Sequence, residues 1–180
     1  MKTGGLEHTM ASRKRLWFLD LLLYSQGLTK KDAANLLNKS PQNLTYIFKE
    51  DNCKLSFVED VSRILGFTTS FQIIERGKPI PTPPEISYTN PKRDRLSFIE
   101  RAMQESGLTR KDILRKARIN AKAYEQIVER GDISIDKIYR IAEALGGMVI
   151  VNVRPQKSKV LNISLNHKVC CYIETTPVNE

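Results

Sequence analysis

The chain has 180 residues, of which 41% are hydrophobic and 27% charged, which excludes a disordered chain and fits one large or two small domains. Lys and Arg outnumber Asp and Glu by 29 to 20, and this basic balance suits nucleic acid or an acidic membrane surface as a partner. No apolar run is long enough for a membrane span or a signal peptide, and the 3 cysteines have no disulfide-framework spacing, so we expect a cytoplasmic protein without membrane attachment.

An internal repeat organises the sequence. A shift of 80 residues lays Gly27–Asp32 (GLTKKD) over Gly107–Asp112 (GLTRKD), and the register continues without a gap. The shift also aligns Arg13, Arg15, Leu16, Phe18, Ile47, Leu65 and Gly66 with Arg93, Arg95, Leu96, Phe98, Ile127, Leu145 and Gly146. Such a match indicates a tandem duplication, with a first repeat at 12–76 and a second repeat at 93–154.

The first repeat begins with two predicted helices. The first runs from about residue 12 to residue 26 and ends at Gly27, which supplies the left-handed conformation that often ends a helix. Thr29 and Asp32 have the spacing of a capping box, so the second helix should begin at Lys30. We expect it to end near Asn38, because asparagine tolerates a positive φ.

Two more helices and a strand complete this repeat. Ser40 and Pro41 mark the start of a third helix, as N-cap and first helical residue, which should run to about residue 49. Ser56 with Glu59 predicts a fourth helix that ends at Gly66. The β-branched and aromatic stretch 69–74 then predicts a strand.

The second repeat follows the same plan. Its expected helices cover 94–106, 110–117, 121–129 and 134–145, and its strand covers 148–153. Residues 77–92 contain five prolines and should form a stiff linker; a peptide ligand for another domain is the weaker alternative. Residues 155–180 should contain a C-terminal hairpin, with strands at 160–165 and 168–174. The expected fold class is mainly α with a small antiparallel β-sheet.

The segments Leu28–Glu50 (LTKKDAANLLNKSPQNLTYIFKE) and Leu108–Gly131 (LTRKDILRKARINAKAYEQIVERG) resemble the Cro/lambda-repressor-like (XRE) helix-turn-helix family. The resemblance implies two lambda-repressor-like helical units, each of which places its third helix in the major groove of DNA. It assigns helix packing to Ala33, Ala34, Leu37, Leu44, Ile47, Ile113, Leu114, Ala117, Tyr124 and Ile127. The family often has glycine at the turn before the third helix, where this chain has Asn38 and Arg118. Arginine takes positive φ less readily, so we expect the second repeat to have a looser turn or a changed role.

The resemblance also indicates which side chains face DNA bases. In the first repeat these are Gln42, Asn43, Thr45 and Tyr46, and glutamine and asparagine can each bond adenine through two atoms. In the second repeat they are Lys122, Glu125 and Gln126, where a carboxylate near phosphates is repelled unless it accepts a bond from cytosine. The alternative is that these residues belong to solvated helix faces.

Basic residues near these helices are candidates for phosphate contacts, which position a protein on DNA without reading sequence. The candidates are Arg13, Lys14, Arg15, Lys30, Lys31, Lys92, Arg93, Arg110, Lys111, Arg115 and Arg118, with Arg95, Lys116 and Lys122 in the same basic segments. A solvated basic face is the alternative.

The expected function is sequence-specific binding of double-stranded DNA by a transcriptional regulator, either a monomeric pseudo-dimer or a homodimer. Because the two candidate reading helices differ, a monomer should bind an asymmetric site. Two alternatives are an antitoxin that represses its own operon, suggested by the helix-to-strand segment Ala144–Val153, and a protein-interaction module. We expect no enzyme activity, cofactor or metal: His8 and His167 lie outside any catalytic motif, and the adjacent Cys170 and Cys171 should point to opposite faces of a strand.

Overall fold

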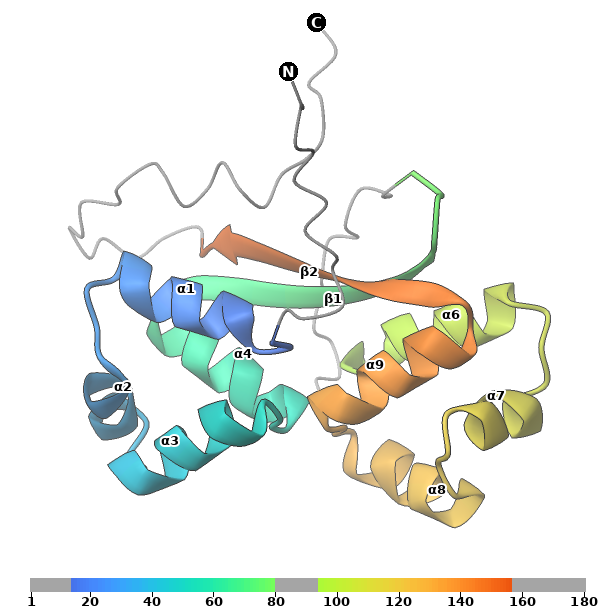
Figure 1. Ribbon diagram of the computed structural model, residues 1–180, viewed down its shortest axis with the longest axis horizontal. Coiled ribbons are helices and arrows are strands. Elements are labelled where there is room, and N and C mark those ends of the chain that lie inside the picture. Colours follow the sequence, from blue (N-terminus) through green and yellow to red (C-terminus); the bar gives the residue numbers. More distant parts are fainter. Residues whose placement is uncertain (1–13, 80–93, 157–180) are drawn as a thin grey trace, which may run out of the picture.

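Each repeat folds into four short helices followed by one strand (Figure 1). The structure, a computed structural model, describes residues 14–79 and 94–156. Within these ranges lie α1 (Trp17–Ser25), α2 (Lys30–Leu36), α3 (Pro41–Glu50), α4 (Leu55–Ile64), β1 (Phe67–Glu75), α6 (Ser97–Glu105), α7 (Arg110–Lys116), α8 (Ala121–Arg130), α9 (Ile135–Ala144) and β2 (Gly147–Pro155). The mainly α fold with a small antiparallel sheet is thereby confirmed. The expected C-terminal hairpin and most of the linker fall outside the described residues.

Side-chain caps begin the central helices where the sequence predicts them. The Thr29 hydroxyl accepts a hydrogen bond from the Asp32 amide, while the Asp32 carboxylate accepts one from the Thr29 amide, so the capping box is complete. Thr109 caps α7 through its hydroxyl, and Ser40 caps α3 ahead of Pro41. Each cap satisfies a backbone donor at the start of its helix.

Three predicted helix starts are wrong. Helix α6 begins at Ser97, three residues later than expected, and has no side-chain cap. Helix α1 begins at Trp17, five residues later than expected, and has no side-chain cap. Helix α4 begins at Leu55 with Lys54 at its N-cap position and no capping side chain. Ser56 and Glu59 therefore do not form a capping box; both side chains bond to the second repeat instead.

The turns before α3 and α8 have the same conformation. Asn38 has φ 52° and Arg118 has φ 54°, so arginine adopts the left-handed region here despite its β-carbon. The Arg118 carbonyl accepts a hydrogen bond from the Arg140 guanidinium at 2.5 Å, and the Ile119 amide bonds back to Leu114 at 2.9 Å. The looser second turn that the sequence suggested is not observed.

The two strands pair with each other and relate the repeats by an approximate two-fold axis. They are antiparallel, with Phe67 opposite Pro155 and Glu75 opposite Gly147, and both extend beyond their predicted ends. Phe71 lies opposite Val151, and these two residues are equivalent under the 80-residue shift. The axis consequently passes between them.

A second set of contacts crosses the same axis on the helical side. The Leu55 amide donates to the Ile133 carbonyl at 2.8 Å, and the equivalent Ile135 amide donates to the Cys53 carbonyl at 2.9 Å. These reciprocal bonds join the starts of α4 and α9. The two repeats are thus fastened at the sheet and again at these helix starts.

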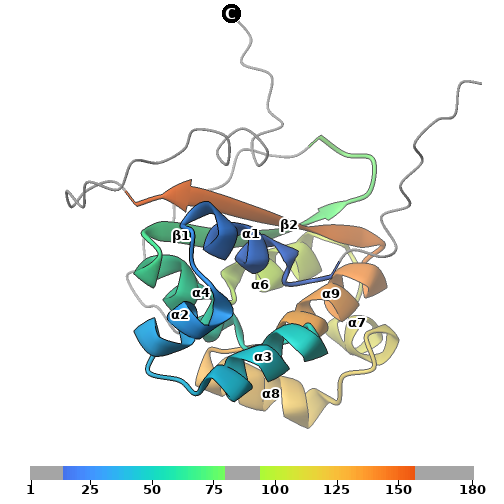
Figure 2. The ribbon, with the colours of Figure 1, turned by 60° about the vertical axis from the view of Figure 1, so that its left-hand side comes forward.

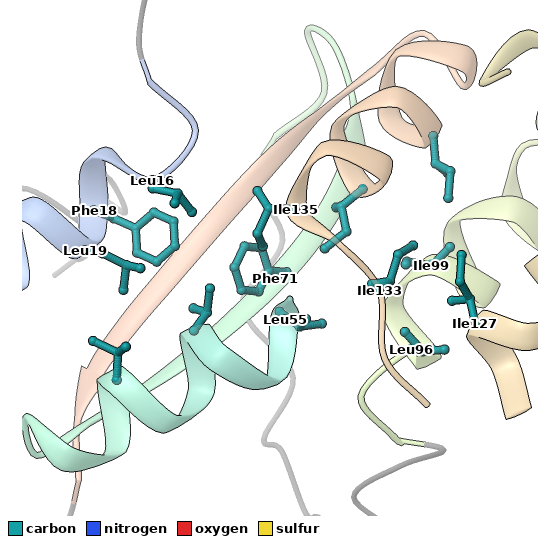
Figure 3. Close-up of a cluster of buried hydrophobic side chains, with 14 of the residues drawn as sticks. Leu16, Phe18, Leu19, Leu55, Phe71, Leu96, Ile99, Ile127, Ile133 and Ile135 are labelled. Atoms are coloured by element: carbon teal, nitrogen blue, oxygen red, sulfur yellow. The ribbon is translucent and has the colours of Figure 1, made fainter. Parts of the chain in front are cut away.

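One hydrophobic cluster extends through both repeats. Phe71 lies at its centre (Figure 3), with its ring centroid 5.9 Å from that of Phe18 in α1 and 6.1 Å from that of Phe98 in α6. Because the strand side chain packs against helices of both repeats, neither repeat has a separate core. Burial of apolar surface is the main stabilising contribution of such a cluster.

Among residues 14–79 and 94–156, every helix falls short of the length and apolar character that a membrane crossing would need.

Candidate nucleic-acid interface

Helices α3 and α8 lie on the face of the molecule opposite the two-stranded sheet. Figures 1 and 2 show both helices at the same end of the molecule, with the sheet at the other end. The pairing of β1 with β2 fixes this arrangement, because it places the second repeat in antiparallel relation to the first. The two predicted reading helices are therefore presented on the same face of the molecule.

Helix α3 presents its predicted reading side chains to solvent. Gln42, Asn43 and Thr45 are exposed, and Tyr46 is 62% exposed. The opposite side of the helix holds it in place through buried apolar residues, of which Leu44 is 1% exposed. The Thr45 hydroxyl donates to the Pro41 carbonyl at 2.9 Å, which leaves its methyl group as the apolar contact that a thymine methyl would meet.

Helix α8 is held in the same way but presents different chemistry. Lys122, Glu125 and Gln126 are exposed, while Tyr124 and Ile127 are buried. Burial raises the pKa of the Tyr124 hydroxyl, an effect that the nearby Arg110 partly offsets. This tyrosine is therefore a neutral packing residue, and the variable chemistry of α8 lies in its charged outer side chains.

The starts of α2 and α7 carry exposed cations beside a capping carboxylate. Hydrogen bonds from Thr29 hold the pKa of Asp32 below its usual value, and the Thr109 hydroxyl does the same for Asp112. Lys31 and Lys111, which directly precede these carboxylates, are exposed. The first turn of each helix thus combines ionised carboxylate caps with positive charge in solvent.

The neighbouring cations Lys30 and Arg110 lie against aromatic rings. The Lys30 ammonium is 4.4 Å from the centroid of the Phe48 ring and 3.2 Å from an Asp20 carboxylate oxygen. The Arg110 guanidinium is 5.8 Å from the centroid of the Tyr124 ring. Such cation–π contacts orient the side chains, and the charge of Lys30 is shared with the Asp20 carboxylate.

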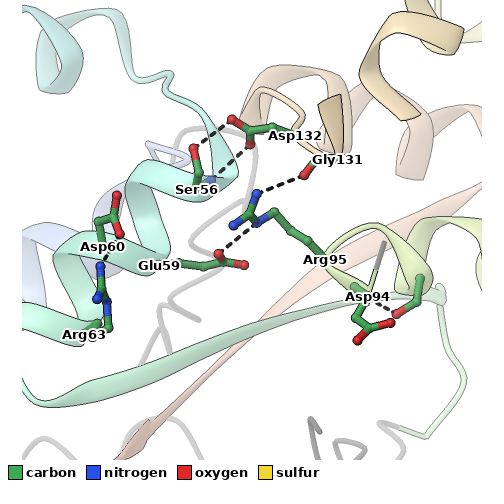
Figure 4. Close-up of polar contacts among 9 residues, drawn as sticks. Ser56, Glu59, Asp60, Arg63, Asp94, Arg95, Gly131 and Asp132 are labelled. Atoms are coloured by element: carbon green, nitrogen blue, oxygen red, sulfur yellow. Dashed lines mark hydrogen bonds and ion pairs between the residues drawn. The ribbon is translucent and has the colours of Figure 1, made fainter. Parts of the chain in front are cut away.

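Arg15 and Arg95 do not lie free for phosphate contacts. The Arg15 guanidinium donates to Asp136 at 2.7 Å. The Arg95 side chain, 16% exposed, donates to Glu59 at 2.8 Å and to the Gly131 carbonyl at 3.0 Å (Figure 4). Both equivalent arginines join one repeat to the other, and these contacts account for them without a role in phosphate binding.

The other phosphate candidates divide into four groups. Arg13, Lys92 and Arg93 lie outside the described residues, whereas Lys14, Lys116 and Lys122 are exposed. Arg115 is exposed but forms an ion pair with Asp112 at 2.8 Å. Arg118 follows the end of α7 and lines a cleft with Arg140, at the opposite end of the helix from Arg110.

The junction of the repeats contains polar groups that the sequence interpretation missed. Ser56 donates to the Asp132 carboxylate through its amide at 3.1 Å and through its hydroxyl at 2.7 Å (Figure 4). Burial raises the pKa of Glu59, although the Arg95 guanidinium favours the charged form. Burial, with nearby Asp132 and Asp51, also raises the pKa of the Cys53 thiol to about 12. The Ser-x-x-Glu spacing suggested a local capping box, and it gave no indication of these long-range contacts.

Comparison of the chain with family models, with curated proteins and with solved structures finds no match.

Proposed function

We propose that the protein binds double-stranded DNA in a sequence-specific manner as a monomeric pseudo-dimer, and that it regulates transcription. The observation that carries the proposal is the presentation of α3 and α8 on one face, with all seven predicted reading side chains exposed. Those residues are Gln42, Asn43, Thr45, Tyr46, Lys122, Glu125 and Gln126. Two helices held in this relation can enter successive major grooves of a duplex.

The sequence resemblance to Cro/lambda-repressor-like proteins supports this proposal alongside the geometry. So do the cations at the starts of α2 and α7, because phosphate contacts supply much of the affinity of such complexes. We assign these contacts to Lys30 and Lys31 in the first repeat and to Arg110 and Lys111 in the second.

The DNA site should be asymmetric. The first repeat offers the amides of Gln42 and Asn43, which favour adenine, whereas the second offers Lys122 for guanine and Glu125 for cytosine. A covalently joined pair meets both halves in one fixed order. The consensus should therefore contain one half rich in A·T pairs and one half that includes G·C pairs.

Selection of bound fragments from random duplex DNA, followed by sequencing, tests the proposal. We expect an asymmetric consensus, bound by one chain. Gln42→Ala/Asn43→Ala should relax the preference in the A·T-rich half and leave the other half unchanged. Gln104→Ala, an exposed change on α6, is the control and should have no effect.

Two outcomes would contradict the proposal. Recovery of no consensus would reject sequence-specific binding, and a palindromic consensus bound by two chains would reject the pseudo-dimer. Co-purification of a stoichiometric small protein that blocks DNA binding would instead favour the antitoxin alternative.

A further inference from the structure

The second repeat contains a cleft of about 980 Å³ between the end of α7 and the end of α9. Apolar groups of Leu108, Ala117, Ala144 and Leu145 form part of its lining, together with Lys116, Arg118, Arg140, Glu143 and Gly146. Three cations and one carboxylate thus line the cleft together with apolar groups. None of these lining residues belongs to α3 or α8, so the cleft is separate from the proposed reading helices.

The first repeat provides a direct comparison, because the 80-residue shift identifies the equivalent positions. Lys116 corresponds to Leu36, which is 50% exposed, and Arg118 corresponds to Asn38. At the positions of Arg140 and Glu143 the first repeat has Asp60 and Arg63, which pair with each other at 2.6 Å. The net charge of these four side chains is therefore zero in the first repeat and +2 in the second.

The cations of the cleft are not neutralised by the carboxylates around them. Lys116 and Arg118 are exposed. The Arg140 guanidinium is oriented by the Arg118 carbonyl and lies 3.5 Å from Asp136, a carboxylate that Arg15 already binds more closely.

We propose that this cleft binds an acidic peptide segment of a partner protein. Carboxylates of the peptide would pair with Lys116, Arg118 and Arg140, and an aliphatic side chain would rest on Leu108 and the neighbouring apolar groups. Charge complementarity of this kind guides association and selects the partner, while the apolar contact adds affinity by burying surface. The volume of the cleft, about 980 Å³, and the exposure of Lys116 and Arg118 favour a peptide over a compact ion.

The test uses the full chain and a short fluorescein-labelled peptide in which glutamate alternates with leucine, followed by fluorescence anisotropy. Lys116→Leu/Arg118→Asn introduces the residues that the first repeat already carries at these positions, so the turn keeps a residue suited to positive φ. We expect this variant to weaken peptide binding about tenfold, the sum of two exposed charge pairs. Glu143→Gln should strengthen binding, and this opposite effect could not arise from unfolding.

Two controls separate the cleft from general charge attraction. Lys31→Leu/Lys39→Asn removes two exposed cations from the first repeat and should change peptide affinity less than about twofold, and a peptide with glutamine in place of glutamate should not bind. Equal weakening by both double variants, or unchanged binding by Lys116→Leu/Arg118→Asn, would overturn the proposal. If that variant weakened duplex DNA binding and left the peptide unaffected, the cleft would be a phosphate contact. DNA binding by α3 and α8 would stand or fall separately, in the selection experiment.

Discussion

Arg95 binds Glu59 across the junction of the repeats at 2.8 Å, whereas its equivalent Arg15 binds Asp136 at 2.7 Å. The two arginines occupy matching positions, but their acceptors do not: the counterpart of Glu59 is Tyr139 and that of Asp136 is Ser56. Each arginine therefore bonds an acid of the other repeat, but at a different position of helix α4 or α9. The two halves of the junction are thus not identical, although the arginines that cross it are equivalent.

The half-buried position of Glu59 predicts a pH-dependent stability. Burial raises the pKa of this carboxyl above its ordinary value of 4.5, so the folded chain binds more protons than the unfolded chain between the two values. The free energy of unfolding should fall as the pH rises through this interval. Glu59→Gln removes this titrating group. The free energy of unfolding of the variant minus that of the wild type should therefore increase as the pH rises from about 4 to 7. Urea unfolding at several pH values measures this difference, with Glu105→Gln as a surface control; a difference that stays constant with pH would contradict the prediction.

Phe71→Ala should destabilise both repeats together. The ring packs on Phe18 and Phe98 from the two repeats, and loss of a buried aromatic side chain costs about 3–5 kcal/mol. Trp17 is the single tryptophan, so its fluorescence follows the first repeat while circular dichroism follows all helices. Both signals should shift to the same lower urea midpoint. Separate transitions in the wild type would show that the repeats unfold independently. Val151→Ala, at the half-buried position opposite Phe71, should lower the free energy of unfolding by less than Phe71→Ala does.

Asp51→Gly should destabilise the protein even though Asp51 has φ 52°. Its carboxylate accepts hydrogen bonds from the amides of Arg15 at 2.6 Å and Leu16 at 2.9 Å, just before α1 begins. Glycine would relieve the backbone but would leave these two amides without their acceptor, at a net cost of about 1 kcal/mol. Chemical denaturation provides the measurement. The stability of Asp51→Asn, which keeps one side-chain oxygen, should lie between that of the wild type and that of Asp51→Gly. An unchanged or higher stability for Asp51→Gly would refute this account of the α1 start.

Lys31→Ala and Lys111→Ala should each weaken DNA binding with little effect on sequence preference. If each lysine contacts one phosphate, its loss should reduce the slope of log affinity against log salt concentration by about 1. Titration of the selected duplex at several salt concentrations measures this slope. Arg101→Ala, an exposed cation on α6, should leave it unchanged. An equal loss of slope for all three would indicate non-specific attraction.

Local features of the fold were predictable from the sequence, and long-range features were not. Two capping signals are local, because the residues of each lie within four positions in the sequence. These are Thr29 with Asp32 and Ser40 with Pro41, and the structure confirms both. The exposed side of α3 likewise follows from helical spacing around Leu44. Ser56 has an equally good local signal, but it bonds to Asp132, which lies 76 residues away, and a local pattern cannot reveal such a partner.

The basic residues show the same limit. Arg15 and Arg95 belong to clusters whose composition suits phosphate binding, and nothing nearby in sequence indicates the acids that bind them. One signal was present in the repeat itself: positions where equivalent residues differ in charge, such as Ser56 and Asp136, mark the asymmetric junction. The same comparison, applied to Asp60 and Arg140, points to the cleft.

The antiparallel pairing of β1 with β2 within one chain has a further consequence. In a homodimer with two-fold symmetry, every substitution occurs twice and must suit both subunits, and dilution lowers the melting temperature by mass action. Here the two strands belong to one chain and cannot part on dilution, so the proposed monomer should have the same melting temperature at any protein concentration. A substitution in one repeat is also not repeated in the other, so the surfaces of the two repeats can diverge independently while the strands stay paired.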